Sequence, residues 1–334
     1  MGDILRTLPA VQMLRRRFPA STIGWALDAG WQILLREQPE IDELLPLPRK
    51  QMSGVAMLPT AARYLASVRR FKADLTLDFH GNLRSGLVTF ASRASHRFGY
   101  EGHQQKEGNR LFTTHRVPSG DRRCPRMERN LDLVAPLGVD STALTVSELA
   151  LPSTGRDEAG RLIHQHLNDR PFALLSPGVS VSQSYKKPPA TLLAEGVRRC
   201  DSAGLKTFVV WGPGEEGDAH EVARLAGSGA ILAPATSLPV LAALTEKACL
   251  FISGDTGPMH LACALGTPVV AVYGPTDPQV NQPWGLRTIA AFDPKVSYSG
   301  VKRLDRERGA YSAIDMQQLQ SSFIAAIEQQ IEKD

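Results

Sequence analysis

The residues best suited to chemistry stand together in one stretch, GDTGPMH, which contains Asp255, Thr256, Gly257 and His260. Asp255 and Thr256 are good helix N-caps, and Pro258 suits the first helical position. The first backbone N–H groups of such a helix lack carbonyl partners, and the helix dipole adds partial positive charge there. We therefore predict an anion site, with a diphosphate as the preferred ligand. The alternative is an ordinary strand–turn–helix crossover.

Four other polar side chains lie beside predicted strands or helix starts. Lys186 and Lys187 stand in a loop where an ammonium group could neutralise a phosphate, or they form a solvated surface pair. Glu216 has the position of the carboxylate that accepts ribose hydroxyls in Rossmann domains, or it complements a helix dipole. Asp3 could cap its helix or take a proton from an attacking hydroxyl. His260, taken alone, would be a packed histidine.

The elements that must position these groups alternate between strand and helix along the whole chain. Apolar runs and turn signals predict strands at 22–27, 41–47, 75–79, 172–178, 206–211 and 268–274, and a further strand that ends at Phe251 and Ile252. Helical spacing and caps predict helices at 3–17, 31–36, 57–71, 83–91, 127–137, 158–167, 189–200, 238–247, 258–265 and 314–333. The fold class is therefore α/β.

Residues 97–116 have weak periodicity and many glycine, basic and amide residues. This composition predicts a surface loop that could become ordered on ligand binding. A plain disordered excursion is the alternative.

The length of 334 residues predicts two domains. We expect two doubly wound Rossmann-like domains that face each other across a cleft, with boundaries at 1–155 and 156–311. The remaining helix, 312–334, could pack across the domain junction, as such tails often do in two-domain α/β enzymes.

The composition is that of an ordinary globular protein, 43% hydrophobic and 22% charged. The chain shows no membrane-spanning run and no signal-peptide pattern, so we expect a cytoplasmic protein. The four cysteines lie far apart and predict free thiols. No zinc spacing, Walker loop, nucleophile elbow or complete GxGxxG motif is present.

Positive charge is concentrated in the first half of the chain. Residues 1–150 hold 21 Lys or Arg and 15 Asp or Glu, whereas the remainder holds 17 and 19. This surplus favours an anionic partner such as a phosphorylated lipid surface, with solvated surface charge as the alternative. Nucleic acid is not expected, because the chain has no interleaved aromatic stacking motif.

Four segments together carry a family resemblance: GDTGPMHLACALGTPVVAVYGPTDP, GDILRTLPAV, DFHGNLRSG and the K-x-x-P pattern from Lys186 to Pro189. They resemble the bacterial ADP-heptose:lipopolysaccharide heptosyltransferases, glycosyltransferases of the GT-B fold, over nearly the whole chain. The resemblance implies inverting transfer of heptose from ADP-heptose to the Kdo or heptose of the inner core, without a metal or other cofactor. It places the enzyme at the cytoplasmic face of the inner membrane, with a lipid A–Kdo type acceptor. The DTG and GPTDP forms look closer to the type that adds the first heptose.

The resemblance also assigns roles to individual residues. Asp3 corresponds to the general base and Lys186 to the lysine that holds the donor phosphates. The other donor-site positions implied are Ser180, Ser182, Glu216, Thr236, Asp255, Thr256, Gly257 and His260. Candidates for binding the anionic acceptor are Arg84, Arg110 and Arg116.

Two positions depart from the family pattern. Family members begin with an apolar strand and a short Ser/Gly loop before the Gly-Asp, whereas this chain starts at Met1-Gly2-Asp3. We expect the sheet edges beside that strand to be unpaired, and an upstream start codon to encode it. Pro188 stands where the family often has Trp, which bears on the shape of the Lys186 loop.

Two other functions fit parts of the pattern. A chain without the first strand could bind ADP-sugar and not catalyse transfer, and a GT-B-like nucleotide-sugar epimerase would share the donor site. The acceptor hydroxyl, the exact donor sugar and the oligomeric state do not follow from the sequence.

Overall fold

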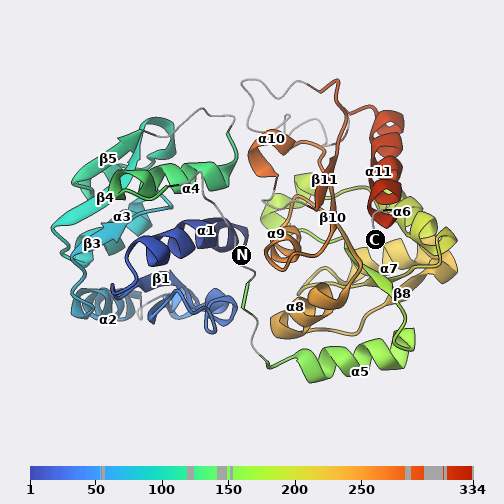
Figure 1. The fold of residues 1–334 in the computed structure, drawn as a ribbon, viewed down its shortest axis with the longest axis horizontal. Coiled ribbons are helices and arrows are strands. Elements are labelled where there is room, and N and C mark those ends of the chain that lie inside the picture. The colour runs from blue at the N-terminus through green and yellow to red at the C-terminus, as the bar shows by residue number, and fades with distance from the viewer. Residues whose placement is uncertain are drawn as a thin grey trace. The chain divides into compact units, whose positions relative to one another are not determined.

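The computed structural model describes residues 1–52, 54, 57–118, 124–140, 149–150, 153–282, 287–296, 311 and 314–332. The chain divides into two compact units (Figure 1). The C-terminal unit consists of Ser153–Asp334 together with Met1–Leu5, and the N-terminal unit consists of Arg6–Pro152. Within the described residues, no helix has the length and apolar character needed to cross a membrane.

The C-terminal unit is built on one parallel sheet of six strands in the order β11-β10-β9-β6-β7-β8. The strands are β6 (Phe172–Ser176), β7 (Lys206–Val209), β8 (Ala230–Leu232), β9 (Leu250–Gly254), β10 (Val269–Val272) and β11 (Thr288–Ala291). The sequence predicted β6, β7, β9 and β10. It did not include β8 and β11, which are short strands at the two edges of the sheet.

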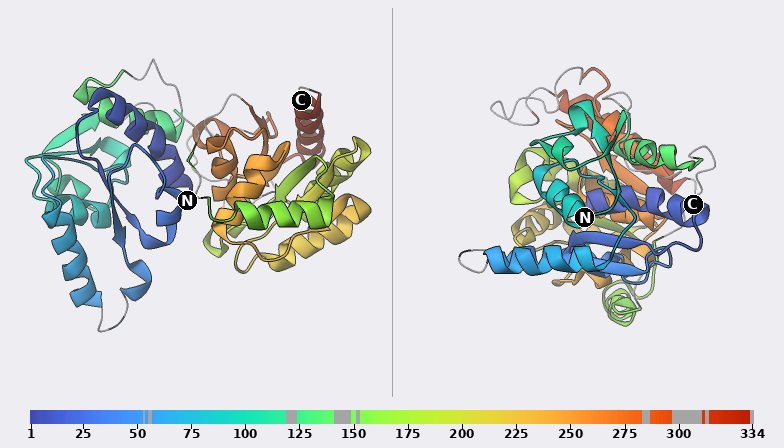
Figure 2. Two further views of the ribbon diagram at one scale, coloured as in Figure 1. Left: turned by 60° about the horizontal axis from the view of Figure 1, so that its bottom comes forward. Right: turned by 90° about the vertical axis from the view of Figure 1, so that its left-hand side faces the viewer.

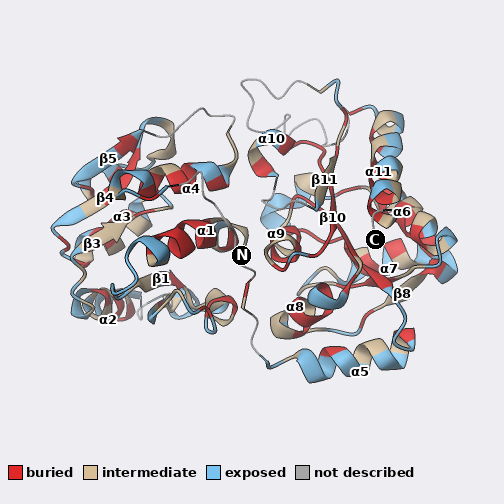
Figure 3. Cartoon of the chain, viewed as in Figure 1, coloured by how far each residue is buried: buried red, intermediate tan, exposed pale blue. Residues whose placement is uncertain are grey.

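Helices cover both faces of this sheet, which fits the rule for parallel sheets. They are α5 (Arg156–Leu167), α6 (Ala190–Ser202), α7 (Glu216–Ala226), α8 (Leu238–Lys247), α9 (Gly257–Ala264), α10 (Pro278–Asn281) and α11 (Met316–Ile331). Strand residues alternate between two apolar cores: Leu175 and Ile252 pack with α6, α7 and α11, whereas Leu174 and Phe251 pack with α5, α8 and α9. The buried strands and inner helix faces are red in Figure 3.

The tail helix α11 begins at its N-cap Asp315, whose side chain accepts hydrogen bonds from the backbone N–H groups of Gln317 and Gln318. It lies beside α6 and packs on β10 and β11 (Figure 1). Phe323 of α11 is fully buried against Gly196 of α6. The predicted helix at 314–333 is therefore confirmed.

The N-terminal unit contains two separate parallel sheets among the described strands. One pairs β1 (Gly24–Asp28) with β2 (Glu43–Leu47), and the other has the order β3 (Leu75–Leu77), β4 (His96–Glu101) and β5 (His115–Pro118). No ladder joins these sheets in the described part of the chain, so β1 and β3 each have an unpaired edge there.

Four α-helices belong mainly to the N-terminal unit: α1 (Gly2–Arg17), α2 (Met57–Arg70), α3 (Leu83–Ala91) and α4 (Arg126–Val134). Figure 2 shows them in two further views, and α2 contacts α3. Leu8, Val11 and Leu14 of α1 are buried, whereas Ile4 is half-buried. Residues 29–34 form a 3-10 helix where the sequence predicted a helix at 31–36. The predicted strand at 75–79 is shorter and only half-buried.

The prediction of a loop at 97–116 is wrong. This segment contains β4, β5 and a 3-10 helix, η5 (Asn109–Leu111). Asn109 is fully buried, and its Nδ2 donates to Asp78 Oδ2 at 2.7 Å and to the backbone oxygen of Asn82 at 2.8 Å. Asp78 Oδ1 in turn accepts the N–H groups of His80 and Gly81. A buried polar network therefore ties this segment to the loop before α3.

Candidate active site

The central strands β6 and β9 mark the point where the strand order reverses. From β6 the chain passes through α6 to β7 on one side, whereas β9 pairs with the other side of β6. Open α/β sheets bind ligands beyond the carboxyl ends of the strands at such a point. The loop after β6 carries Lys186, and the loop after β9 carries Asp255.

The predicted helix after GDT is present as α9, with Thr256 as N-cap in extended conformation. The helix gives way to a turn at Gly266, which has φ +74°, as the sequence indicated. The Thr256 hydroxyl makes no capping bond, and its buried Oγ1 has no hydrogen-bond partner among the described residues. A buried hydroxyl left in this state is suited to receive a hydrogen bond from, or donate one to, a bound ligand.

Lys186 is held at the start of α9 by an ion pair. Its Nζ donates to Asp255 Oδ2 at 2.8 Å, and the two side chains are only 13% and 3% exposed. The neighbouring Lys187 makes a pair of equal length with Asp218, but its side chain is 42% exposed. Of the two lysines, Lys186 is therefore the one that the fold brings to Asp255.

Pro188 packs closely against the end of β9. A Cβ added to Gly254 would lie 3.0 Å from Pro188 Cδ, so the ring rests directly on the end of β9. The Tyr311 hydroxyl also donates to the Lys186 backbone oxygen at 3.3 Å. These contacts position the Lys186 loop against the Asp255 loop.

The first residues of the chain pack on α9 within the C-terminal unit. A Cβ on Gly2 would lie 2.9 Å from His260 Cδ2, and a Cβ on Gly257 would lie 2.9 Å from Met1 Cε. His260 is buried, which agrees with the packed-histidine alternative. Asp3 is exposed in the first turn of α1, one residue beyond the contact between Gly2 and His260.

Glu215, which the sequence reasoning missed, is more enclosed than its neighbour Glu216. Glu216 is exposed and lies 3.8 Å from His220 of its own helix. Glu215 accepts the Gly212 N–H at 3.1 Å and packs directly against Gly178, in the loop after β6. Burial raises the pKa of the Glu215 carboxyl, the Gly212 N–H lowers it, and Asp218 raises it. Because Glu215 and Glu216 are adjacent, the sequence contains no signal that distinguishes the enclosed carboxylate from the exposed one.

The remaining predicted donor residues follow other strands at the same edge of the sheet. Ser180 and Ser182 are exposed in the loop after β6, at the 3-10 helix Val181–Lys186. Thr236 is half-buried after β8, just before the N-cap of α8. Because all these strands are parallel, their following loops share one edge.

The three predicted acceptor arginines lie in the N-terminal unit, and all are exposed. Arg84 is on α3 and Arg110 is on η5, two elements in contact with each other. Arg116 is on β5, the outer strand of its sheet. The structure thus brings Arg84 and Arg110 onto neighbouring elements and places Arg116 on a separate one.

Comparison with known proteins now decides the family. The model of glycosyltransferase family 9 (heptosyltransferase) matches residues 61–310. The chain belongs to glycosyltransferase family 9. A curated member, lipopolysaccharide heptosyltransferase 3 of Escherichia coli K12, is 24% identical, with 100% of this chain and 96% of the relative covered. The protein is therefore a glycosyltransferase of the heptosyltransferase family of lipopolysaccharide core biosynthesis.

Solved structures of family 9 enzymes show the same fold. A glycosyltransferase family 9 protein of Veillonella parvula has a TM-score of 0.81 at 23% identity, covering 100% of this chain and 94% of that one. E. coli heptosyltransferase WaaC with ADP has a TM-score of 0.75 at 22% identity, covering 100% and 96%. The predicted GT-B fold is confirmed. The epimerase and non-catalytic alternatives receive no support from these relatives.

The cysteines of this family 9 enzyme are free thiols, as predicted. Burial raises the pKa of Cys200 to about 11 and that of Cys263 to about 12, so both stay protonated and unreactive near neutral pH. In the described part of the chain, no three His, Cys, Asp or Glu residues are grouped to hold a metal ion.

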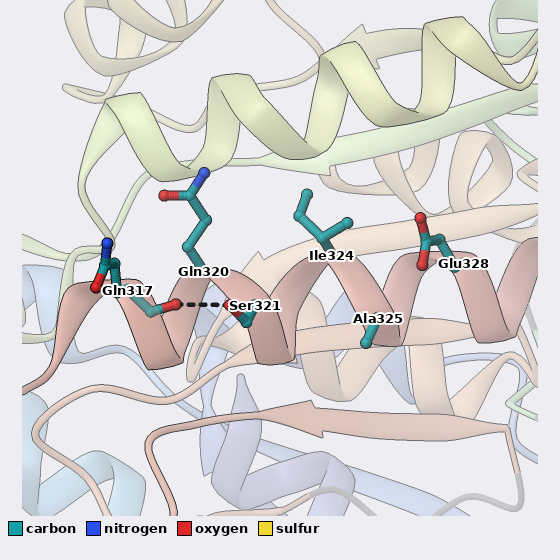
Figure 4. A pocket seen from close by; sticks show the side chains of 6 residues that line it. All are labelled: Gln317, Gln320, Ser321, Ile324, Ala325 and Glu328. Carbon is teal, nitrogen blue, oxygen red and sulfur yellow. Dashed lines mark hydrogen bonds between the residues drawn. The ribbon is translucent and has the colours of Figure 1, made fainter.

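A surface depression lies along α11 (Figure 4). The Ser321 hydroxyl donates to the Gln317 backbone oxygen at 2.9 Å there, which satisfies it within the helix. The six lining residues all come from this one helix: Gln317, Gln320, Ser321, Ile324, Ala325 and Glu328. None of them is a predicted site residue of the family 9 enzyme.

Proposed function

We propose that this family 9 enzyme transfers heptose from ADP-heptose to the Kdo or heptose of the lipopolysaccharide inner core, with inversion at the anomeric carbon. The observation that carries the proposal is the junction of the β6 and β9 loops. There Lys186 pairs with Asp255 beside the N-terminus of α9 and Thr256 Oγ1, which has no hydrogen-bond partner among the described residues. This combination suits a diphosphate.

The donor is assigned as an ADP-sugar on two grounds. The anion site lies at the switch point of a Rossmann-like sheet, where nucleotides bind. The related WaaC binds ADP, and we extend that ligand to this chain. Positive charge for the diphosphate comes from Lys186 and the α9 dipole, so the proposal includes no metal.

The leaving group is stabilised as the anomeric C–O bond breaks. Negative charge then grows on the diphosphate, and Lys186 with the N–H groups at the start of α9 interacts more strongly with the transition state than with the bound donor. The Asp255 carboxylate keeps the Lys186 ammonium in place before the donor arrives. Thr256 Oγ1, for which the described part of the chain supplies no partner, forms a hydrogen bond with the diphosphate.

Asp3 is assigned as the general base. It removes the proton from the acceptor hydroxyl as that oxygen attacks, and a single displacement inverts the anomeric carbon. Support comes from the packing of Met1 and Gly2 on Gly257 and His260, which places the first turn of α1 next to α9. We assign Arg84, Arg110 and Arg116 to the anionic lipid A–Kdo acceptor, at the cytoplasmic face of the inner membrane.

The two adjacent lysines provide a matched test of the phosphate role. Lys186→Met should lower kcat for transfer from ADP-heptose to Kdo–lipid A by about 10²–10³, because it removes a charge that stabilises the leaving group. Lys187→Met removes an equally short but exposed ion pair and should leave kcat nearly unchanged. Transfer is measured as heptosylated product by mass spectrometry, and the anomeric configuration by NMR.

Three results would overturn the proposal. Equal kcat for Lys186→Met and the parent protein would remove the phosphate role. Retained anomeric configuration would exclude the single displacement. Binding of ADP-heptose without any transfer would favour the non-catalytic alternative, and donor conversion without acceptor would favour an epimerase.

A further inference from the structure

An exposed apolar stripe runs along α3 in the N-terminal unit. Leu83, Leu87 and Phe90 recur at helical spacing and are 45%, 44% and 58% exposed. Leu111 of the adjacent η5 is 75% exposed and extends the stripe. Most large apolar side chains of the described protein are buried, so a group of four exposed ones marks an interaction surface.

The stripe is held firmly by its supporting contacts. η5 approaches α3 so closely at Gly86 that a Cβ there would overlap the Phe112 ring. Phe112 meets Phe90 edge to face with ring centroids 6.1 Å apart. The buried Asn109 ties η5 to the loop before α3 through Asp78 and Asn82. The exposed apolar side chains therefore lie on α3 and η5, two elements that are packed and hydrogen-bonded to their surroundings.

Cationic groups border the stripe. Arg84 lies beside it on α3, and Arg110 precedes Leu111 on η5. The Arg97 guanidinium lies 6.0 Å from the centre of the Phe90 ring. Between residues 83 and 111 the chain has five Lys or Arg and two Glu. One of these, Glu107, accepts the Leu83 N–H at 3.2 Å and so complements the start of α3.

We propose that this surface, Leu83, Leu87, Phe90 and Leu111 with Arg84, Arg97 and Arg110, docks the enzyme on an anionic lipid bilayer. Apolar side chains flanked by cations suit the headgroup boundary, where leucine and phenylalanine enter the acyl region and arginine meets lipid phosphate. Charge complementarity favours this occupant over a second copy of the chain, whose matching surface would bring the same cations together. This docking surface rests on the proposed function in one respect: that function takes its acceptor lipid from a membrane.

Vesicle sedimentation of the full chain tests the surface. The protein should bind vesicles of phosphatidylcholine mixed with phosphatidylglycerol, bind phosphatidylcholine alone much less, and dissociate as salt is raised. Leu111→Glu and Leu87→Glu should each lower the partition coefficient at least about tenfold, because each removes an inserted leucine and adds repulsion. Leu58→Glu is the matched control, since Leu58 is 74% exposed on α2 of the same unit.

Transfer to a lipid-free Kdo acceptor separates this inference from the proposed function. The glutamate variants should keep the parent rate on that acceptor while losing vesicle binding. Unchanged vesicle binding by both variants, or equal loss with Leu58→Glu, would overturn the surface assignment. A parent dimer that Leu111→Glu converts to monomer would instead assign the stripe to a second copy. If the parent protein transfers no heptose, the proposed function is contradicted. The docking surface is not, because vesicle binding is measured in a separate experiment.

Discussion

At the scale of single residues, Thr256 Oγ1 distinguishes a binding role from a structural one. It is buried without a partner in the described free protein, although its residue stands at the N-cap position where a threonine hydroxyl usually bonds to the helix. A ligand that supplies the missing bond would explain why threonine is tolerated here. Removal of this hydroxyl should therefore raise the stability of the free protein and lower its affinity for the ligand.

Thr256→Val should raise the free energy of unfolding of the free protein by about 1 kcal/mol, because it removes an unsatisfied buried hydroxyl. The same change should weaken ADP binding about tenfold, because the hydrogen bond to the diphosphate is lost. Urea unfolding and isothermal titration calorimetry measure the two effects.

Thr267→Val is the matched control for this pair of effects. The buried Thr267 hydroxyl donates to the Thr245 backbone oxygen at 2.8 Å, so its loss should lower stability by about 1 kcal/mol and leave ADP affinity unchanged. A Thr256→Val protein that is less stable, or that binds ADP as tightly as the parent, would argue against a ligand role for the hydroxyl.

At the scale of elements, close approach of α6 and α11 organises one side of the C-terminal sheet. The α6 residue facing α11 is Gly196, and a Cβ there would lie 2.6 Å from Phe323 Cε1 and Cζ. Phe323 is fully buried within the core that also holds Leu193 and Val197. The absence of a side chain at 196 therefore sets how deeply α11 can pack.

Gly196→Ala should lower the free energy of unfolding by about 1–3 kcal/mol, because overpacking against Phe323 exceeds the gain in helix propensity. Gly160→Ala on α5 is the control, since a Cβ there meets nothing within 4 Å. That change should raise stability by roughly 0.5–1 kcal/mol. Urea midpoints for the two variants that shift in the same direction would contradict this account of the packing.

Sequence patterns predicted these elements wherever apolar periodicity and caps agree. The prediction for α8, at 238–247, matches the structure at both ends. The patterns failed at β8 and β11, three- and four-residue edge strands whose side chains are mostly half-buried. They also failed at β4 and β5, where a segment predicted to be a loop pairs as parallel strands and buries Phe98, Tyr100 and Val117. Strands of three or four residues are too short for an alternation of apolar and polar residues to be recognised.

At the scale of the whole molecule, each unit has an apolar core of its own. The C-terminal unit has one on each face of its sheet, and the N-terminal unit has cores around Leu131 and Leu133 of α4. Units with separate cores can unfold as separate cooperative transitions. The proposed donor residues from Ser180 to His260, and Asp3 beside them, all fall in the C-terminal unit.

Differential scanning calorimetry of the full chain should therefore show two heat-absorption peaks. ADP at about 100 times its Kd should stabilise one of them by about 2.7 kcal/mol, because ligand binding stabilises only the unit that holds the site. A single peak would contradict separate unfolding of the two units, and an equal shift of both peaks with ADP would contradict the assignment of the nucleotide to the C-terminal unit.

The α/β class, the α9 helix with its Thr256 cap and the family resemblance could all be predicted from the sequence, because they depend on neighbouring residues. Tertiary structure decided which groups meet. Lys186 and Asp255 are 69 positions apart and pair only because β6 lies beside β9 in the sheet. The pairing of β6 with β7 likewise brings the loop that carries Glu215 beside Gly178. Local periodicity and capping are encoded in consecutive residues, whereas strand order depends on packing of the whole unit.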